Sequence, residues 1–296
     1  MSTYLDPLSS KAVFIDNAGI NLEVHDFGET SDKLVILLHG FPECWGAWRH
    51  QIAPLVTAGY RVLVPNLRGY GKGDKPAKII DYRIDKLATD IDALLMFAQH
   101  DKCHLVGHDW GGAIAWWYGI HCSDKLHSLS ILNAPHPLAF LEVLKKSPHQ
   151  WLKSWYIFFF QLPWLPEALM SRLNFKRLRD TLTKTSNKGA YDQRDIALLT
   201  HTWSQPGCIR AMLNYYRCLL RDIKQPLHPA KVECPSQLLW GEQDLALTLP
   251  MAELSINYLA NGKLKRFPDA SHWLNHDKPQ AVTAELLQFF EQSQLC

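Results

Sequence analysis

The sequence lacks a strong charge of either sign, paired cysteine motifs and any long apolar run. In a chain of 296 residues, 31 Lys and Arg residues oppose 29 Asp and Glu residues, so the formal net charge is only +2. A charge this close to zero gives no global electrostatic argument for binding nucleic acid or an anionic membrane. The most apolar stretch, residues 155–165, contains Gln161 and Pro163 and falls far short of the roughly 20 residues that span a bilayer. We therefore expect no nucleic-acid partner and no membrane span.

The cysteines are seven in number and never stand in a C-x-x-C spacing. An odd count without that spacing fits neither a zinc site nor a disulfide framework, so we expect thiols in a reducing compartment. Residues 1–11 show no basic start followed by an apolar core, the pattern of a secretory signal. These features predict a cytoplasmic protein without a metal site.

Short apolar runs rich in Val, Ile and Leu recur along the chain and are typical of buried strands. Two of them precede the first expected helix, which suggests an antiparallel edge. Later runs alternate with helical stretches such as residues 84–99, where apolar side chains recur at a three-to-four spacing. This alternation predicts an α/β protein with a mostly parallel, eight-stranded sheet covered by helices on both faces. The expected strands are residues 11–15, 21–27, 34–38, 61–64, 103–106, 128–132, 236–240 and 263–267.

The alternation is interrupted by a long helical insertion. Residues 137–226 are helix-like and rich in aromatic side chains, and prolines near both ends suit domain junctions. In an open α/β sheet, an insertion after a strand lies over the carboxyl ends of the strands, where such sheets bind ligands. We predict an α/β core of residues 1–136 and 227–296 with a helical cap of residues 137–226. The cluster of aromatic residues around Trp155 fits an apolar substrate pocket and fits plain cap core equally well.

The six residues GHDWGG at 107–112 lie between a strand-like run and a helix-like run, residues 113–122. A strand, a glycine-bracketed turn and a helix form the setting of a nucleophile elbow, with Asp109 in the place of the usual serine. A carboxylate that attacks a saturated carbon leaves an alkyl ester that water can hydrolyse, whereas attack on an acyl carbon gives only a mixed anhydride. We therefore predict that Asp109 is a nucleophile toward electrophilic alkyl carbons. The alternative is an ordinary aspartate that caps a helix.

Turnover of such an ester requires a base that activates water, and His272 follows the last expected strand. A histidine suits a base near neutral pH, and its position fits the chain order nucleophile, acid, base. Asp244, at the carboxyl end of the preceding strand, is the expected acceptor of the second ring proton of His272. No acid follows the sixth expected strand, where the chain reads Asn133-Ala134-Pro135. Three other carboxylates compete with Asp244 for this role, namely Glu242, Asp269 and Asp277.

The segment HGFP at 39–42 follows the strand expected at residues 34–38. The loop after that strand supplies an oxyanion-hole amide in this architecture. We therefore expect the main-chain amides of Phe41 and Trp110 to hold the oxyanion that forms when water attacks the Asp109 ester. A plain turn built on glycine and proline is the alternative.

Together these motifs resemble the epoxide hydrolase family of the α/β-hydrolase fold, over nearly the whole chain. The resemblance rests on HGxP at 39–42, on GHDWGG at 107–112 and on two tyrosine segments, WYIFFFQ at 155–161 and NYYR at 214–217. It implies Tyr156 and Tyr216 as the groups that hold the epoxide oxygen, with Tyr215 as the neighbouring alternative. A phenol can hydrogen-bond and protonate the alkoxide that ring opening leaves. The resemblance thus implies a cofactor-free hydrolase that converts a small apolar epoxide and water to a vicinal diol.

Two other interpretations stay open at this point. A haloalkane or haloacid dehalogenase resembles the chain in its nucleophile, base and ester, although Phe41 and Trp110 stand where the haloalkane and fluoroacetate enzymes carry Asn and Arg. From a different class, a non-enzymatic ligand-binding protein could share the fold. A serine esterase is disfavoured because the elbow holds neither Ser nor Cys. The sequence does not distinguish a monomer from a homodimer and does not identify the physiological epoxide.

Overall fold

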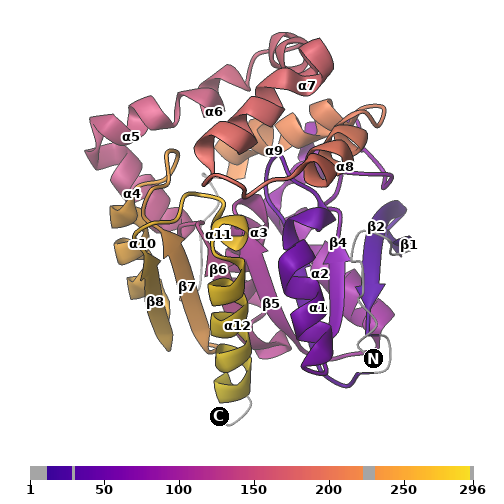
Figure 1. The fold of residues 1–296 in the computed structure, drawn as a ribbon, viewed down its shortest axis with the longest axis vertical. Coiled ribbons are helices and arrows are strands. Elements are labelled where there is room, and N and C mark those ends of the chain that lie inside the picture. Colours follow the sequence, from indigo (N-terminus) through magenta and orange to yellow (C-terminus); the bar gives the residue numbers. More distant parts are fainter. Residues whose placement is uncertain (1–11, 29–30, 223–230, 294–296) are drawn as a thin grey trace.

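An eight-stranded sheet forms the centre of the computed structural model, which describes residues 12–28, 31–222 and 231–293. The strand order is β1-β2-β4-β3-β5-β6-β7-β8 (Figure 1). The strands β4, β3, β5, β6, β7 and β8 run parallel to one another. Strands β1 and β2 are antiparallel to each other, and β2 is antiparallel to β4, so the antiparallel edge is confirmed. The strands are β1 (Ala12–Asn17), β2 (Ile20–Phe27), β3 (Leu34–Leu38), β4 (Arg61–Pro65), β5 (Cys103–His108), β6 (Leu126–Leu132), β7 (Ser236–Gly241) and β8 (Gly262–Phe267).

The predicted mostly parallel sheet of an α/β protein is therefore confirmed, with small differences at the strand ends. Strand β5 continues two residues beyond the apolar run, because its ladder with β6 extends to the pairing of His108 with Leu132. Central strands β3 and β5 are buried throughout, as expected where helices cover both faces of a parallel sheet. Residue 11, the predicted start of the first strand, lies outside the described residues.

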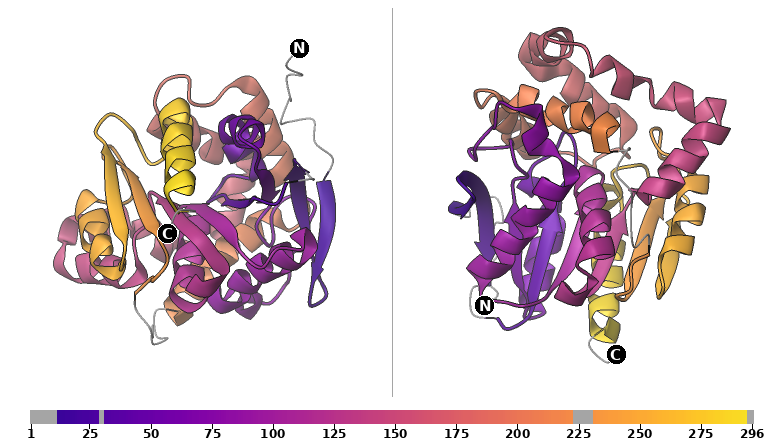
Figure 2. Two further views of the ribbon diagram at one scale, coloured as in Figure 1. Left: turned by 90° about the horizontal axis from the view of Figure 1, so that it is seen from below. Right: turned by 180° about the vertical axis from the view of Figure 1, so that it is seen from behind.

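Helices cover the two faces of the sheet, with α1 and α12 together on one face and α2, α3 and α10 on the other (Figures 1 and 2). The predicted helix at 84–99 ends at Ala98, because Gln99 adopts a left-handed conformation with φ of 58°. These helices are α1 (Arg49–Thr57), α2 (Ile84–Ala98), α3 (Trp110–His121), α10 (Leu249–Ser255), α11 (Leu274–Asp277) and α12 (Pro279–Ser293). Short 3₁₀ helices lie at Trp45–Trp48, Ile79–Tyr82, Ser123–Lys125 and Ile256–Tyr258.

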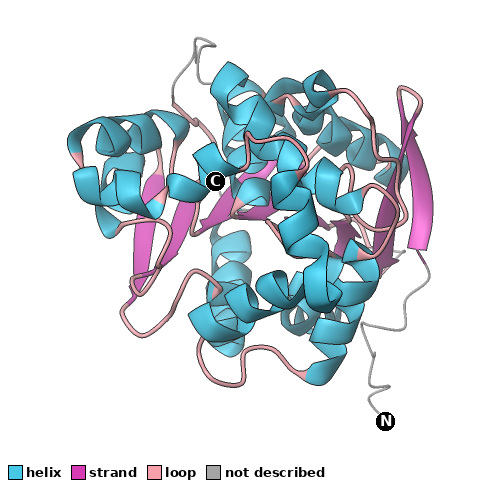
Figure 3. Ribbon diagram, turned by 90° about the horizontal axis from the view of Figure 1, so that it is seen from above, coloured by secondary structure: helices cyan, strands magenta, loops and turns pink. Residues whose placement is uncertain are grey.

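Residues 137–222, between β6 and β7, are mostly helical and lie above the carboxyl ends of the parallel strands (Figures 1 and 3). We call α4 to α9 the helical insertion. Its helix α7 is interrupted at residues 172–175, whose backbone angles are not helical. The predicted boundary at 226/227 lies outside the described residues. The helices are α4 (Pro137–Lys146), α5 (Pro148–Lys153), α6 (Trp155–Phe159), α7 (Leu165–Thr185), α8 (Gln193–Trp203) and α9 (Cys208–Asp222).

Candidate active site

Asp109 occupies a sharp turn between β5 and α3, with φ of 50° and ψ of −117°. A positive φ is uncommon outside glycine and marks backbone strain held by the surrounding structure. That structure is tight, because a Cβ atom at Gly111 would overlap the carbonyl groups of Leu38 and His39. Helix α3 begins directly after Asp109, at Trp110, and not at residue 113 as the apolar run suggested. The turn thus presents the Asp109 side chain at the carboxyl edge of the sheet, next to the loop after β3.

The loop after β3 supplies the first contact to the Asp109 carboxylate. The main-chain N–H of Phe41 donates a hydrogen bond to Asp109 Oδ1 at 2.7 Å. Gly40 permits this approach, because a Cβ atom there would overlap the Asp109 side chain. His39 is buried and neutral: its Nε2 accepts a hydrogen bond from the Leu67 amide, and burial lowers its pKa to about 4. The amide of Trp110, the first residue of α3, remains a predicted second donor.

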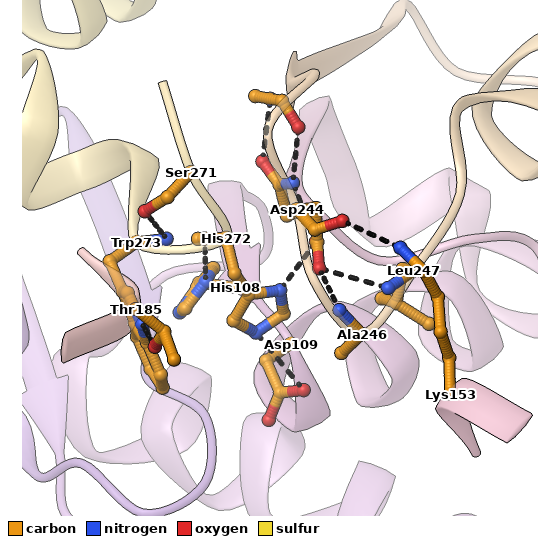
Figure 4. A network of polar contacts seen from close by, with 12 residues as sticks. His108, Asp109, Lys153, Thr185, Asp244, Ala246, Leu247, Ser271, His272 and Trp273 are labelled. Carbon is orange, nitrogen blue, oxygen red and sulfur yellow. Dashed lines mark hydrogen bonds and ion pairs between the residues drawn. The ribbon is translucent and has the colours of Figure 1, made fainter. Parts of the chain in front are cut away.

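His272 lies between two carboxylates (Figure 4). Its Nδ1 is 2.6 Å from Oδ2 of Asp244, and its Nε2 is 3.5 Å from Oδ2 of Asp109. Asp244 is buried, and its other oxygen accepts hydrogen bonds from the amides of Ala246 and Leu247, at 2.7 and 2.9 Å. These contacts fix the orientation of the carboxylate behind the imidazole ring.

The three competing carboxylates have other partners. Glu242 pairs with Arg266 at 2.7 Å. Asp269 pairs with Lys278. Asp277 accepts hydrogen bonds from the amide and hydroxyl of Ser271, at 2.7 and 2.6 Å. The structure therefore brings Asp244, and none of these three, to the ring of His272.

The charges of this trio, Asp109, Asp244 and His272, shift the pKa values of His272 and Asp244. Burial alone would lower the pKa of His272, but the charge of Asp244 and contacts with Asp109 outweigh burial and raise the pKa to about 10. Burial would raise the pKa of Asp244, yet the charge of His272 and hydrogen bonds from Leu247 and Asn133 hold it below its usual value. His272 is therefore an imidazolium at neutral pH.

The two tyrosines named by the resemblance lie together beside Asp109. Tyr156 belongs to α6 and Tyr216 to α9, and their ring centroids are 5.8 Å apart in an edge-to-face arrangement. Burial and the nearby charge of Asp109 raise the pKa of both phenols above its usual value, so both keep their protons at neutral pH. Tyr215 points elsewhere, since its hydroxyl donates to the Arg68 carbonyl at 2.7 Å.

Three buried polar residues that the sequence did not single out support the trio. Asn133 donates from Nδ2 to Asp244 at 2.9 Å. His108 has Nε2 2.9 Å from the carbonyl oxygen of His272 and Nδ1 3.3 Å from Glu43. A carbonyl only accepts, so Nε2 of His108 carries the proton. Glu43 directly follows the HGFP segment, and His108 directly precedes Asp109. Their positions next to these motifs were the sequence signal that could have pointed to a supporting role.

Two cavities meet at Asp109. One, of about 210 Å³, and another, of about 530 Å³, are both lined by Asp109, Tyr156 and Tyr216. The smaller cavity extends between α3 and α4, and the larger extends under α6 and α7 past His272. The aromatic residues around Trp155 do not all face the same environment. Trp155, Phe159 and Phe160 line the larger cavity, and Trp155 is also exposed on its other side. Trp151, Phe158 and Trp164 are exposed at the surface and line neither cavity.

Comparisons with known proteins agree with the fold described above. Residues 33–279 match the model of the alpha/beta hydrolase fold family. The AB hydrolase superfamily protein YfhM of Bacillus subtilis is 39% identical over 95% of this chain and 98% of its own length. Human epoxide hydrolase 4 is 38% identical over 95% of this chain and 78% of its own length. The structure of Bacillus megaterium epoxide hydrolase bound to an inhibitor superposes with a TM-score of 0.86 at 30% identity, covering 94% of this chain and all of that one.

The fold and its elbow define an α/β hydrolase. The chain belongs to the α/β-hydrolase fold family, in the group formed by its epoxide hydrolase relatives, and is an enzyme. No helix among the residues that the structure describes has the length and apolar character needed to cross a bilayer.

Proposed function

We propose that this enzyme hydrolyses apolar epoxides to vicinal diols through an alkyl ester on Asp109. The observation that supports this most is the convergence on one cavity of a carboxylate, a histidine and two phenols. A nucleophile and base alone suit any alkyl electrophile, but paired phenols suit an oxygen leaving group. The epoxide hydrolases among the relatives and solved structures support the same substrate class.

In the first step, one carboxylate oxygen of Asp109 attacks a ring carbon, and the bond from that carbon to the epoxide oxygen breaks. The Phe41 amide holds Oδ1, which leaves Oδ2 as the attacking oxygen. Tyr156 and Tyr216 donate hydrogen bonds to the epoxide oxygen, and one phenol transfers its proton as negative charge develops there. The apolar walls of the cavity exclude bulk water, which strengthens these interactions.

In the second step, ester formation itself activates His272. The ester removes the charge of Asp109, one of the two carboxylates that raise the pKa of the imidazolium. The proton of His272 Nε2 is then released more readily and passes, by way of water, to the phenolate that the first step left, which restores the tyrosine. The neutral ring takes a proton from a second water molecule while Asp244 stabilises the imidazolium that forms. Hydroxide adds to the ester carbonyl, and the amides of Phe41 and Trp110 hold the oxyanion. Collapse of this intermediate breaks the bond to the alkyl oxygen, which takes the proton of the added hydroxyl group, so that the diol leaves and the Asp109 carboxylate is restored.

We further propose that the helical insertion acts as a cap domain, residues 137–226, over a core of residues 1–136 and 227–296. The position of Tyr156 and Tyr216 in the insertion, facing Asp109 in the core, supports this division. A cytoplasmic location is also proposed, since the six cysteines among the described residues are thiols and five of them are buried.

The test is diol formation from styrene oxide, with halide release from 1-haloalkanes measured in parallel. Diol without halide, abolished in Asp109→Asn, is the expected result. Halide without diol would assign the chain to the dehalogenases. Neither product, together with no covalent adduct on Asp109 after incubation with a panel of epoxides, would favour a ligand-binding member of the fold.

Trapping the intermediate assigns the base. In His272→Gln the ester should form and persist, which raises the intact protein mass by the mass of one epoxide. An unmodified Asp109 in this variant, with an epoxide that the wild type consumes, would count against His272 as the base that hydrolyses the ester.

A further inference from the structure

Helices α5 and α6 lie at the upper edge of the molecule, in the helical insertion (Figure 1), and they present large apolar side chains to solvent. Four of these side chains form one groove together with the end of α4. Isolated exposed apolar residues are ordinary, but a contiguous set of this size marks an interaction surface. The exposed fractions are 48% for Trp151, 74% for Leu152, 62% for Trp155 and 44% for Phe158. We call these four residues, with Lys145 and Lys146 at the rim, the α5–α6 face.

The local fold determines which side of these short helices is exposed. Gln150 of α5 is fully buried and donates to the Ala246 carbonyl at 2.8 Å. Ile157 of α6 is also buried. These two contacts turn the opposite sides of both helices outward, where the rings of Trp151 and Phe158 stack with centroids 5.3 Å apart. The face is therefore a built amphipathic surface, not a frayed segment.

The charge around this face has one dominant sign. Residues 137–165 contain three lysines, Lys145, Lys146 and Lys153, against a single acidic residue, Glu142. Lys146 pairs with Glu142 at 2.7 Å, so Lys145 and Lys153 carry the excess. The near-zero net charge of the whole chain conceals this local excess. Tryptophan with flanking lysine is the combination that favours the interface of a bilayer carrying anionic lipids, where rings enter the headgroup layer and ammonium groups meet phosphates.

The face is continuous with the cavity that reaches the nucleophile. Trp155 lines both the surface groove and the cavity of about 530 Å³ that contains Asp109 and His272. Lys153, the last residue of α5, lines the same cavity. Because Trp155 is itself 62% exposed, the cavity reaches the surface beside it, and whatever covers the α5–α6 face lies at this opening.

We propose that the α5–α6 face docks on the surface of a bilayer that contains anionic phospholipids. Docking sets the mouth of the cavity against the membrane, where apolar epoxides dissolve, and this consequence rests on the proposed function. A second copy of the chain fits less well, because a two-fold interface would bring the same basic rim onto itself.

The test measures binding of the full chain to sedimented vesicles of phosphatidylcholine with 30% phosphatidylglycerol. The double variants Trp151→Ser with Leu152→Ser and Lys145→Glu with Lys146→Glu should each weaken binding at least about tenfold. None of these four side chains lines the two cavities at Asp109.

The matched control is Phe14→Ser with Met96→Ser, which removes side chains that are 53% and 79% exposed on β1 and α2, and it should bind as the wild type does. Melting curves establish that each variant folds.

Binding that needs phosphatidylglycerol, weakens in high salt and survives in the control supports the proposal. Absence of binding, or equal loss in the control, overturns it. Light scattering tests whether a second copy of the chain covers the α5–α6 face. A wild-type dimer that both face variants convert to a monomer would assign the face to that second copy and would also overturn the proposal. Diol formation from dissolved styrene oxide is measured separately, so failure of the proposed activity leaves the binding result interpretable.

Discussion

Asn133 donates a hydrogen bond from Nδ2 to Oδ2 of Asp244 at 2.9 Å, the same oxygen that contacts His272. The amide oxygen of Asn133 accepts from the Gly241 amide at 2.9 Å, which ties the end of β6 to the end of β7. The residue after β6 thus supplies no acid of its own and instead holds the acid that follows β7.

Removing either partner should slow hydrolysis of the ester. Asp244→Asn leaves the shape but removes the charge that stabilises the imidazolium, so we expect a fall in kcat of about 10³-fold or more. Asn133→Ala removes one hydrogen bond to a charged group, for which a loss of about tenfold is expected. Single-turnover decay of the ester measures both. Asn275→Ala, which removes a buried amide bonded to the Ala47 carbonyl, is the control. A wild-type decay rate in Asn133→Ala would contradict this role.

The raised pKa of His272 predicts how stability depends on pH. Its folded-state pKa is about 10 against an ordinary value of 6.5, so its contribution is fully present below pH 6.5 and is lost as pH rises through about 10. Between these values the free energy of unfolding should fall by up to about 1.4 kcal/mol per pH unit. Urea unfolding from pH 6 to 10 measures the slope. In His272→Gln the slope should be much smaller, and an equal slope would assign it to other groups.

The two adjacent tyrosines should separate activity from stability. Tyr216→Phe removes a proposed proton donor, so formation of the ester should slow by about tenfold to a hundredfold, less than a sole acid would cost. Tyr215→Phe leaves the buried Arg68 carbonyl without this donor and should cost about 1–2 kcal/mol of stability with activity near that of the wild type. Rapid-mixing kinetics and urea unfolding of both variants make the comparison. Slow ester formation in Tyr215→Phe, with a loss of stability alone in Tyr216→Phe, would assign the proton-donor role to Tyr215.

Several features of this molecule follow from its sequence because their signals are local. Apolar runs bounded by turn residues predict the strands of the sheet, and the glycines around Asp109 predict the elbow. Asp109, Asp244 and His272 each follow a strand-like run, and parallel strands end at one edge of the sheet, so these local positions, with the chain order, were enough to expect that they meet. Those signals reflect backbone geometry within a few residues.

Other features depend on contacts between distant segments and have no local signal. Glu43 contacts His108, His276 and Tyr191, which come from three other parts of the chain. The outward position of Trp151 depends on which side of α5 packs against Ala246. Phe159 and Phe160, a short way along the same aromatic-rich segment, line a cavity instead. Aromatic composition alone does not separate these two outcomes.

Glu43 should be a major source of stability. It is buried, and its Oε1 accepts from Tyr191 at 3.0 Å and contacts Nε2 of His276 at 2.6 Å. Glu43→Gln removes the charge that His108 and His276 face, and we expect a loss of about 3 kcal/mol or more in the free energy of unfolding. Glu285→Gln breaks an exposed pair with Lys265 and should cost less than about 1 kcal/mol. Similar urea midpoints for the two variants would contradict a structural role for the Glu43 network.

The ester mechanism is tested most directly by one turnover in water labelled with oxygen-18, with enzyme in excess over styrene oxide. If water attacks the ester carbonyl, the label enters the carboxylate of Asp109 and the first diol carries none. Mass spectrometry of the peptide that contains Asp109 and of the diol reads both products. Label in the diol and none in Asp109 would show that water attacks the epoxide directly, and the covalent mechanism would be wrong.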